Sequence, residues 1–207
     1  MIEKNGALLM ENVIQKLNYA PKRSILITGD VANFKLLEKS DREALKRFFA
    51  QASEHETESL RDDVRDSATI DRWIHGLDYH RVLPLLAWDE PMEKIAGVSS
   101  LHLLKGVYRH TAEVRIFVGK DYRRLGLGSA MIKELIEIGN KLGLYFLKAE
   151  ILAENQLAIK AFRQLGFEAK CTIEDGFMTL GKGETRDAVL LMKRLQINLE
   201  EDFFYVF

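Results

Sequence analysis

The stretch DYRRLGLGSAM, residues 121–131, decides how this sequence is interpreted. Two arginines and two closely spaced glycines precede an apolar run with helical spacing. Glycines let a backbone approach a ligand closely because they carry no Cβ atom. The amide groups at the start of a helix favour an anion. The stretch therefore predicts an anion-binding loop, and the identity of the anion depends on the elements around it.

Four interpretations of this loop compete. A nucleotide P-loop would need Gly-x-x-x-x-Gly-Lys-Ser/Thr, and that string does not occur. A dinucleotide fingerprint would begin at Gly126 and Gly128, but Met131 stands at its third glycine position and polar residues separate the loop from the preceding strand. A solvated turn is the third interpretation. The fourth is a pyrophosphate cradle, with charge from Arg123 and Arg124 and with amides from Arg124, Gly126, Leu127, Gly128 and Ser129.

The surrounding residues predict strands and two helices. TAEVRIFV (111–118) alternates between apolar and polar positions, as a half-buried strand does. Apolar residues at helical spacing over 131–142 predict an amphipathic helix, which Gly143 ends. LYFLKAEIL (144–152) is another strand, and a short helix capped by Asn155 precedes the last two strands. The order predicts an α/β or α+β sheet with few helices.

Length and composition predict a globular protein of the cytoplasm. The 207 residues suit one domain at 25–195, with an N-terminal extension at 1–24 and a tail at 196–207. The aromatic tail is expected to dock on its own domain, and a homodimer contact is the alternative. The single cysteine, Cys171, excludes an internal disulfide and argues against a cysteine-built metal site. No metal is expected.

Charge and hydropathy also exclude two partner classes. A net charge of −1 gives no overall attraction to nucleic acid or anionic lipid. No apolar run approaches the roughly 20 residues of a membrane-spanning helix. The N-terminus lacks the basic start and the long apolar middle of a signal peptide. We therefore expect no nucleic acid and no membrane as partner.

The pattern Arg123-x-x-Gly126-x-Gly128 resembles the coenzyme A signature of the GNAT superfamily of N-acetyltransferases. AEVRIFV before it and LAENQLAIKAFRQLGF (152–167) after it strengthen the resemblance, which extends over residues 30–195. Bacterial protein-lysine acetyltransferase domains look most similar. The resemblance implies a GNAT fold: a mixed, mostly antiparallel sheet of six to seven strands, a splayed central strand pair and about four helices.

The resemblance also implies a cosubstrate and its contacts. Acetyl-CoA would bind the loop, with its pantetheine arm against the backbone of Ile116, Phe117 and Val118. Asn155 would open the second cofactor segment. Phe162 stands where many relatives have a tyrosine that protonates the leaving thiolate, so we expect slower or solvent-assisted protonation.

Glu113 is the expected catalytic base, because many family members keep a glutamate on this strand. Partial burial is expected to raise the pKa of its carboxyl group usefully. The acceptor would be a primary amine, with a protein lysine as the first hypothesis. A small amine or polyamine is the alternative substrate, and an acyl-CoA-binding sensor that has lost turnover is the alternative class of protein.

Overall fold

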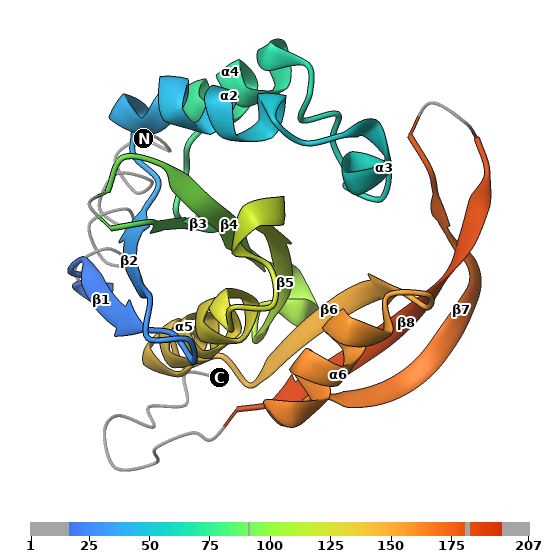
Figure 1. The fold of residues 1–207 in the computed structure, drawn as a ribbon. Coiled ribbons are helices and arrows are strands. Elements are labelled where there is room, and N and C mark those ends of the chain that lie inside the picture. The colour runs from blue at the N-terminus through green and yellow to red at the C-terminus, as the bar shows by residue number, and fades with distance from the viewer. Residues whose placement is uncertain (1–16, 91, 181–182, 196–207) are drawn as a thin grey trace, which may run out of the picture.

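The computed structural model describes residues 17–90, 92–180 and 183–195. Within this part of the chain, eight strands form one sheet in the order β1-β2-β3-β4-β5-β6-β8-β7 (Figure 1). The strands are β1 (Lys22–Ile25), β2 (Val31–Leu36), β3 (Val82–Trp88), β4 (Ile95–Leu103), β5 (Thr111–Val118), β6 (Phe146–Leu152), β7 (Glu168–Met178) and β8 (Thr185–Arg194). The helices are α2 (Arg42–Ala50), α3 (Glu54–Thr57), α4 (Ser67–His75), α5 (Leu127–Lys141) and α6 (Gln156–Gln164), with short 3-10 turns η1 (Lys39–Asp41), η2 (Gly106–Tyr108) and η3 (Lys120–Tyr122).

The predicted fold class is confirmed, but the predicted strand count is wrong. All neighbouring strands are antiparallel except β5 and β6, which are parallel. The sheet has eight strands instead of six to seven, and β1 pairs with β2 at one of its edges. Leu17 is buried in the larger core. Part of the expected N-terminal extension, residues 17–24, therefore packs into the domain, while 1–16 and the tail at 196–207 lie outside the described residues.

Helices cover both faces of the sheet (Figure 1). On one face, α5 buries Met131, Leu135 and Ile138 in the larger apolar core, as their spacing predicted. On the other face, α2 and α4 form a second core with the central strands. Each of these three helices presents one apolar stripe, and burying that stripe against a sheet face is the main source of its stability.

The parallel pair β5 and β6 diverges after a short contact, as the family resemblance implied. Their register runs only from Thr111 opposite Phe146 to Glu113 opposite Lys148. Beyond that point, β5 continues to Val118 and stays paired with β4 on its other side. The backbone edge of β5 that faces β6 therefore has no strand partner in this stretch. Glu113 stands at the last paired position, where the two strands begin to separate.

Candidate active site

The glycine-rich loop leads from η3 into the first turn of α5. Gly126, the residue before the helix, has a φ of +87°, a backbone conformation that glycine adopts without strain. A Cβ atom built on Gly128 would meet only Val118, at 3.7 Å, so its outer side is open. In the described part of the chain, no hydrogen bond uses the amides of Leu127, Gly128 or Ser129 as donors. These free amides at a helix start suit an anion.

The two arginines of the loop differ in what they contact. Arg123 donates from Nε to the carbonyl oxygen of Val118 at 3.1 Å. Its Nη2 lies 2.7 Å from Oε1 of Glu56, which reaches over from α3. Arg124 has a positive φ of 63°, and its side chain makes no hydrogen bond or ion pair within the described part of the chain. Arg124 is thus free to meet an anion, whereas Arg123 already has a carboxylate partner.

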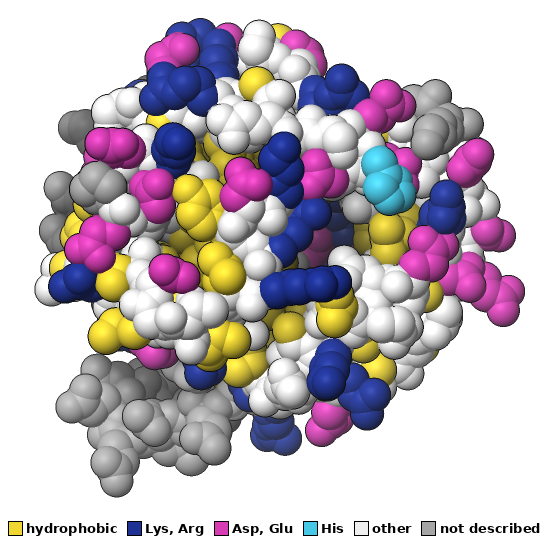
Figure 2. All heavy atoms as spheres, in the orientation of Figure 1, with side chains coloured by type: hydrophobic (Ala, Val, Ile, Leu, Met, Phe, Trp, Pro, Cys, Tyr) yellow, Lys and Arg dark blue, Asp and Glu magenta, His cyan; other side chains and the backbone are white. Residues whose placement is uncertain are grey.

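Glu113 lies in a cluster of charges at the point where β5 and β6 separate. Its Oε1 accepts from Nε of Arg115 at 2.8 Å and lies 3.0 Å from Nη2 of Arg61. Its Oε2 lies 3.4 Å from Nζ of Lys148. Arg61 and Lys148 also contact Glu150 on β6, at 2.8 and 3.2 Å. Figure 2 shows Lys and Arg side chains around a hollow in the gap between β5 and β6, with acidic atoms deeper inside.

The expected rise in the pKa of Glu113 is wrong. The side chain is buried, and burial alone would raise the pKa. The hydrogen bond from Arg115 and the positive charges of Arg115, Arg61 and Lys148 outweigh burial, so the pKa lies below its ordinary value of 4.5. Sequence reasoning overlooked Arg61 and Lys148 because they come from the loop after α3 and from β6, and it overlooked Arg115 although that residue is two positions away on β5. The carboxylate is ionised at neutral pH.

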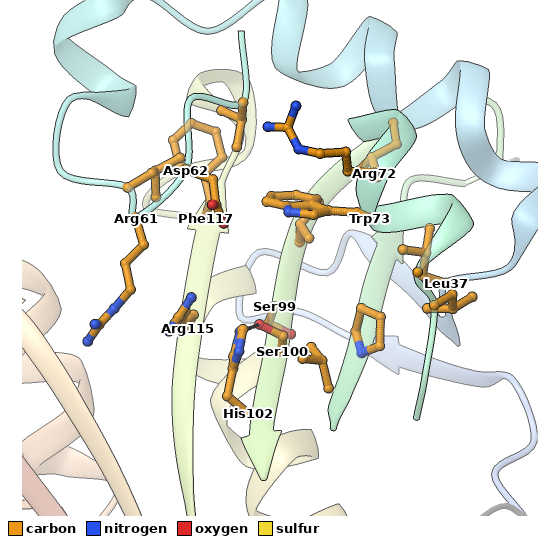
Figure 3. Close-up of a pocket in the computed structure, with 18 of the residues that line it drawn as sticks. Leu37, Arg61, Asp62, Arg72, Trp73, Ser99, Ser100, His102, Arg115 and Phe117 are labelled. Carbon is orange, nitrogen blue, oxygen red and sulfur yellow. Dashed lines mark hydrogen bonds between the residues drawn. The ribbon is translucent and has the colours of Figure 1, made fainter. Parts of the chain in front are cut away.

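A cavity of about 360 Å³ opens beside β5, on the face covered by α2 and α4. Strands β3, β4 and β5 form its floor, and Phe49 of α2, Trp73 of α4 and Leu60 line its apolar side. Ile116 and Phe117 also border the cavity, so it reaches the unpaired edge of β5. Figure 3 shows Trp73 above the floor on which Ser100, His102 and Arg115 stand. A molecule in this cavity would lie next to the strand expected to hold the pantetheine arm.

His102 is a cavity residue that sequence reasoning missed. It pairs with Glu113 across the antiparallel β4–β5 ladder, and its Nε2 lies 3.0 Å from Oγ of Ser100. Burial lowers the pKa of its imidazole to about 4, and the positive charges of Arg115 and Arg61 add to the effect. The imidazole is therefore neutral at pH 7. Its place opposite Glu113 follows from the register of β4 against β5.

Asn155 and Phe162 take different places on α6. Asn155 caps the helix, because its Oδ1 accepts from the amide of Ala158 at 3.1 Å, as predicted. Phe162 is only 2% exposed and meets the ring of Phe167 edge to face, with 4.9 Å between centroids. It belongs to the main apolar core and does not line the cavity beside β5. Cofactor contacts of both residues remain predictions.

The described residues were searched for a metal-binding cluster and for a membrane-spanning helix, and they contain neither. No group of three or more His, Cys, Asp or Glu residues there is arranged to hold a metal ion. None of the described helices combines the length and apolar character that crossing a membrane requires.

The chain belongs to the acetyltransferase (GNAT) family. Residues 42–167, more than half of the chain, match that family. An uncharacterized N-acetyltransferase of Methanocaldococcus jannaschii is 40% identical over 63 residues, which are 30% of this chain and 28% of that protein. A Bacillus subtilis protein provisionally named a phosphinothricin acetyltransferase is 31% identical over 97 residues, 46% of this chain and 58% of that protein. These alignments span less than two thirds of either relative.

The fold is also similar to solved structures. An acetyltransferase-like protein from Salmonella typhimurium, solved with its cofactor acetyl-CoA, superimposes with a TM-score of 0.67 and 18% identity. The superposition covers 84% of this chain and 99% of that one. At this identity, the likeness demonstrates a shared fold.

Proposed function

We propose that the protein is an acetyl-CoA-dependent N-acetyltransferase in which a primary amine attacks the acetyl thioester directly. The observation that carries this proposal is the junction of the glycine-rich loop, with its free amides at the start of α5, and the unpaired edge of β5. The loop suits the pyrophosphate of coenzyme A, and the strand edge suits its amide-containing arm. Bound there, acetyl-CoA would supply an activated acyl group.

Residues of the chain would hold the cosubstrate and the amine in position for this reaction. The amides of Leu127, Gly128 and Ser129 and the guanidinium of Arg124 would hold the pyrophosphate. The unpaired backbone of Ile116, Phe117 and Val118 would fix the arm and polarise the thioester carbonyl. Holding the amine in line with that carbonyl carbon provides much of the acceleration.

Glu113 remains the proposed proton acceptor. Its carboxylate is ionised at neutral pH, but it has three cationic partners and does not itself line the cavity. We therefore assign it a role through water: one water would take the proton from the attacking amine and pass it to Glu113. His102 is neutral and lies beside Glu113. It would accept or donate a hydrogen bond at the floor of the cavity.

The shape of the cavity narrows the range of candidate acceptor molecules. A protein lysine is the hypothesis from the resemblance, because bacterial lysine acetyltransferase domains look most similar. A recessed, mainly apolar cavity of about 360 Å³ instead favours a small amine, since pockets of this size bury most of a small ligand. The small amine is thus the second candidate acceptor, and this cavity is the observation that favours it.

Release of free thiol from acetyl-CoA tests the proposal. Turnover with small amines but not with lysine peptides or lysine-rich proteins would support the second candidate, and the reverse would support the first. Binding of acetyl-CoA without thiol release with either class would support a sensor. Absence of both binding and release would overturn the proposed function.

A further inference from the structure

The floor of the cavity changes from apolar to polar along its strands. Alternate residues of a strand face the same side of a sheet, so Val98, Ser100 and His102 of β4 share the face that α2 and α4 cover. Their partners on β5 are, in the same order, Phe117, Arg115 and Glu113. The floor therefore has an apolar row at one end and two polar rows at the other.

An aromatic wall stands over the apolar row. Phe49 of α2 meets Trp73 of α4 edge to face, with 6.0 Å between the ring centroids. The same ring of Phe49 lies 5.6 Å from the ring of Phe117 on β5. All three rings line the cavity, and Figure 3 shows Trp73 above the strands of the floor. Such a wall offers a large apolar contact area to a bound molecule.

The charged residues of the lining are exposed to solvent or already paired. The exposed ones are Arg61, Asp62, Arg72 and Arg81. Arg115 donates its Nε to Glu113, and Oδ1 of Asp78 accepts the amide of His80 at 3.0 Å. Among the described residues, neither lining carboxylate is thus both buried and free to hold the second ammonium group of a polyamine.

Ser100 presents a hydroxyl group at the polar end of the floor. Its Oγ lies 3.0 Å from Nε2 of His102. In the imidazole tautomer with its proton on Nδ1, Ser100 donates to Nε2, and its oxygen can still accept a hydrogen bond from an amine. The neighbouring Ser99 pairs with Ile116 of β5. An amine held by Ser100 would therefore lie near the strand that is expected to fix the thioester.

The floor disfavours a cation. Burial lowers the pKa of His102, and the positive charges of Arg115 and Arg61 lower it further. The same surroundings would lower the pKa of an amine bound at Ser100 and increase the share of its neutral, nucleophilic form.

We propose that the cavity selects a primary amine on an apolar body, an alkylamine or arylalkylamine, with the amine at Ser100 and the body against Trp73 and Phe49. This proposal rests on the proposed N-acetyltransferase function and adds the substrate class. Polyamines are disfavoured because a second ammonium group would enter the apolar section. A protein lysine is disfavoured because the polar backbone behind its short stem would have to pass between the rings.

Thiol release from acetyl-CoA with matched amines tests the substrate class on the wild-type chain. From propylamine through pentylamine to heptylamine, kcat/KM should rise about fourfold for each added methylene, the effect of burying one such group. Heptylamine should exceed hexamethylenediamine, which has the same length and a second ammonium group, by at least about 10-fold. Phenethylamine should likewise exceed Nα-acetyllysine amide.

Two variants separate the ends of the bound amine. Trp73→Ala should reduce kcat/KM strongly for heptylamine and phenethylamine and little for propylamine. Tyr108→Ala is the matched control, because this ring is exposed on η2 and does not line the cavity. Its amine series should equal that of the wild type.

Ser100→Ala should reduce kcat/KM about fivefold for every amine alike, as the loss of one hydrogen bond allows. Ser100→Thr keeps the hydroxyl and should retain most of the activity. Thermal unfolding of each variant, with and without acetyl-CoA, excludes misfolding and loss of the cosubstrate as causes. The wild-type series decides the question even if Trp73→Ala does not fold.

A flat alkyl series, or equal kcat/KM for heptylamine and hexamethylenediamine, would overturn the substrate class, as would a preference for Nα-acetyllysine amide. An equal loss for propylamine and heptylamine in a folded Trp73→Ala would overturn the role of the wall. In these cases thiol release would still support the transferase function. If acetyl-CoA neither stabilises the chain nor releases thiol with any amine, the proposed function itself fails, and the substrate class with it. Stabilisation by acetyl-CoA without thiol release with any amine would overturn the substrate class and leave the cosubstrate site standing.

Discussion

The guanidinium of Arg61 lies 3.0 Å from the carboxylate of Glu113, and the same Nη2 lies 2.8 Å from Glu150. Because Glu113 is on β5 and Glu150 on β6, Arg61 connects the two strands just where their pairing ends. The loop that carries Arg61 also lines the cavity. One side chain thus links the acceptor cavity to the proposed base and to both strands of the splayed pair.

Glu113→Gln should lower turnover by about 100-fold, the usual size of a general-base contribution, with acetyl-CoA binding nearly unchanged. The variant also removes the negative charge that pairs with Arg61, Arg115 and Lys148. A lower Tm is therefore expected as well. Glu137→Gln, which affects only the ion pair with Lys22, is the matched control. Steady-state kinetics below the Tm measure the effect; unchanged turnover would exclude Glu113 as base.

The pH dependence of turnover should lack an inflection from Glu113. Its folded pKa lies below 4.5, so the carboxylate is fully ionised in the range from about pH 6 to about pH 9. Its contribution to stability is present above the unfolded value and is lost as the pH falls through the lower folded pKa. Turnover should therefore rise with pH as the amine loses its proton. An inflection near neutral pH that disappears in Glu113→Gln would refute this assignment.

Substitutions of the two loop glycines should have different effects. Gly126→Ala should cost about 1 kcal/mol or more, because an alanine would need a φ of +87° and its Cβ would lie 2.9 Å from Ile27. Gly128→Ala should leave the free protein as stable as the wild type, since its Cβ meets only Val118. Gly128→Glu should fold but lose stabilisation by acetyl-CoA. Thermal unfolding with and without the ligand measures all three.

Glu56→Gln should tighten coenzyme A binding by up to about fivefold, the upper range for an exposed ion pair. Glu56 holds Arg123 at 2.7 Å, so an incoming pyrophosphate must compete with it. Glutamine keeps the cap on Ser53, because it can still accept the hydrogen bond from that amide. Glu54→Gln serves as control, and calorimetry at two salt concentrations should show a smaller gain at high salt. Equal affinities of both variants would mean that Glu56 does not compete.

Phe162→Tyr should lower stability by about 1–3 kcal/mol without raising turnover. The ring is 2% exposed against Phe167, so an added hydroxyl would enter an apolar core. Chemical denaturation measures the stability and thiol release the turnover. A faster variant would show that the hydroxyl reaches the leaving sulfur and that the missing acid limits the rate.

Local patterns predicted the elements, while contacts between distant segments determined the chemistry of the site. The alternation over 111–118 and the glycines at 126 and 128 are properties of short stretches, and both predicted their elements correctly. The pKa of Glu113 depends on Arg61, which is 52 positions away in the chain, and on Lys148 of β6. No local pattern encodes such contacts, because they require the register of the parallel strands and the path of the loop after α3.

Strand pairing locates one site residue that the sequence patterns did not identify. The pairing of β4 with β5 places His102 opposite Glu113. The cavity residues of α4 could not be found in this way, because only the packing of that helix over the sheet brings Arg72 and Trp73 to the cavity.

The most direct test of the account is thermal unfolding of the wild type and of Gly128→Glu in the presence of acetyl-CoA. At a concentration of about 100 times Kd, the ligand should stabilise the wild type by about 2.7 kcal/mol and leave the variant unchanged. If acetyl-CoA does not raise the Tm of the wild type, or raises that of Gly128→Glu equally, the loop at 123–129 does not bind coenzyme A and the proposed function is contradicted.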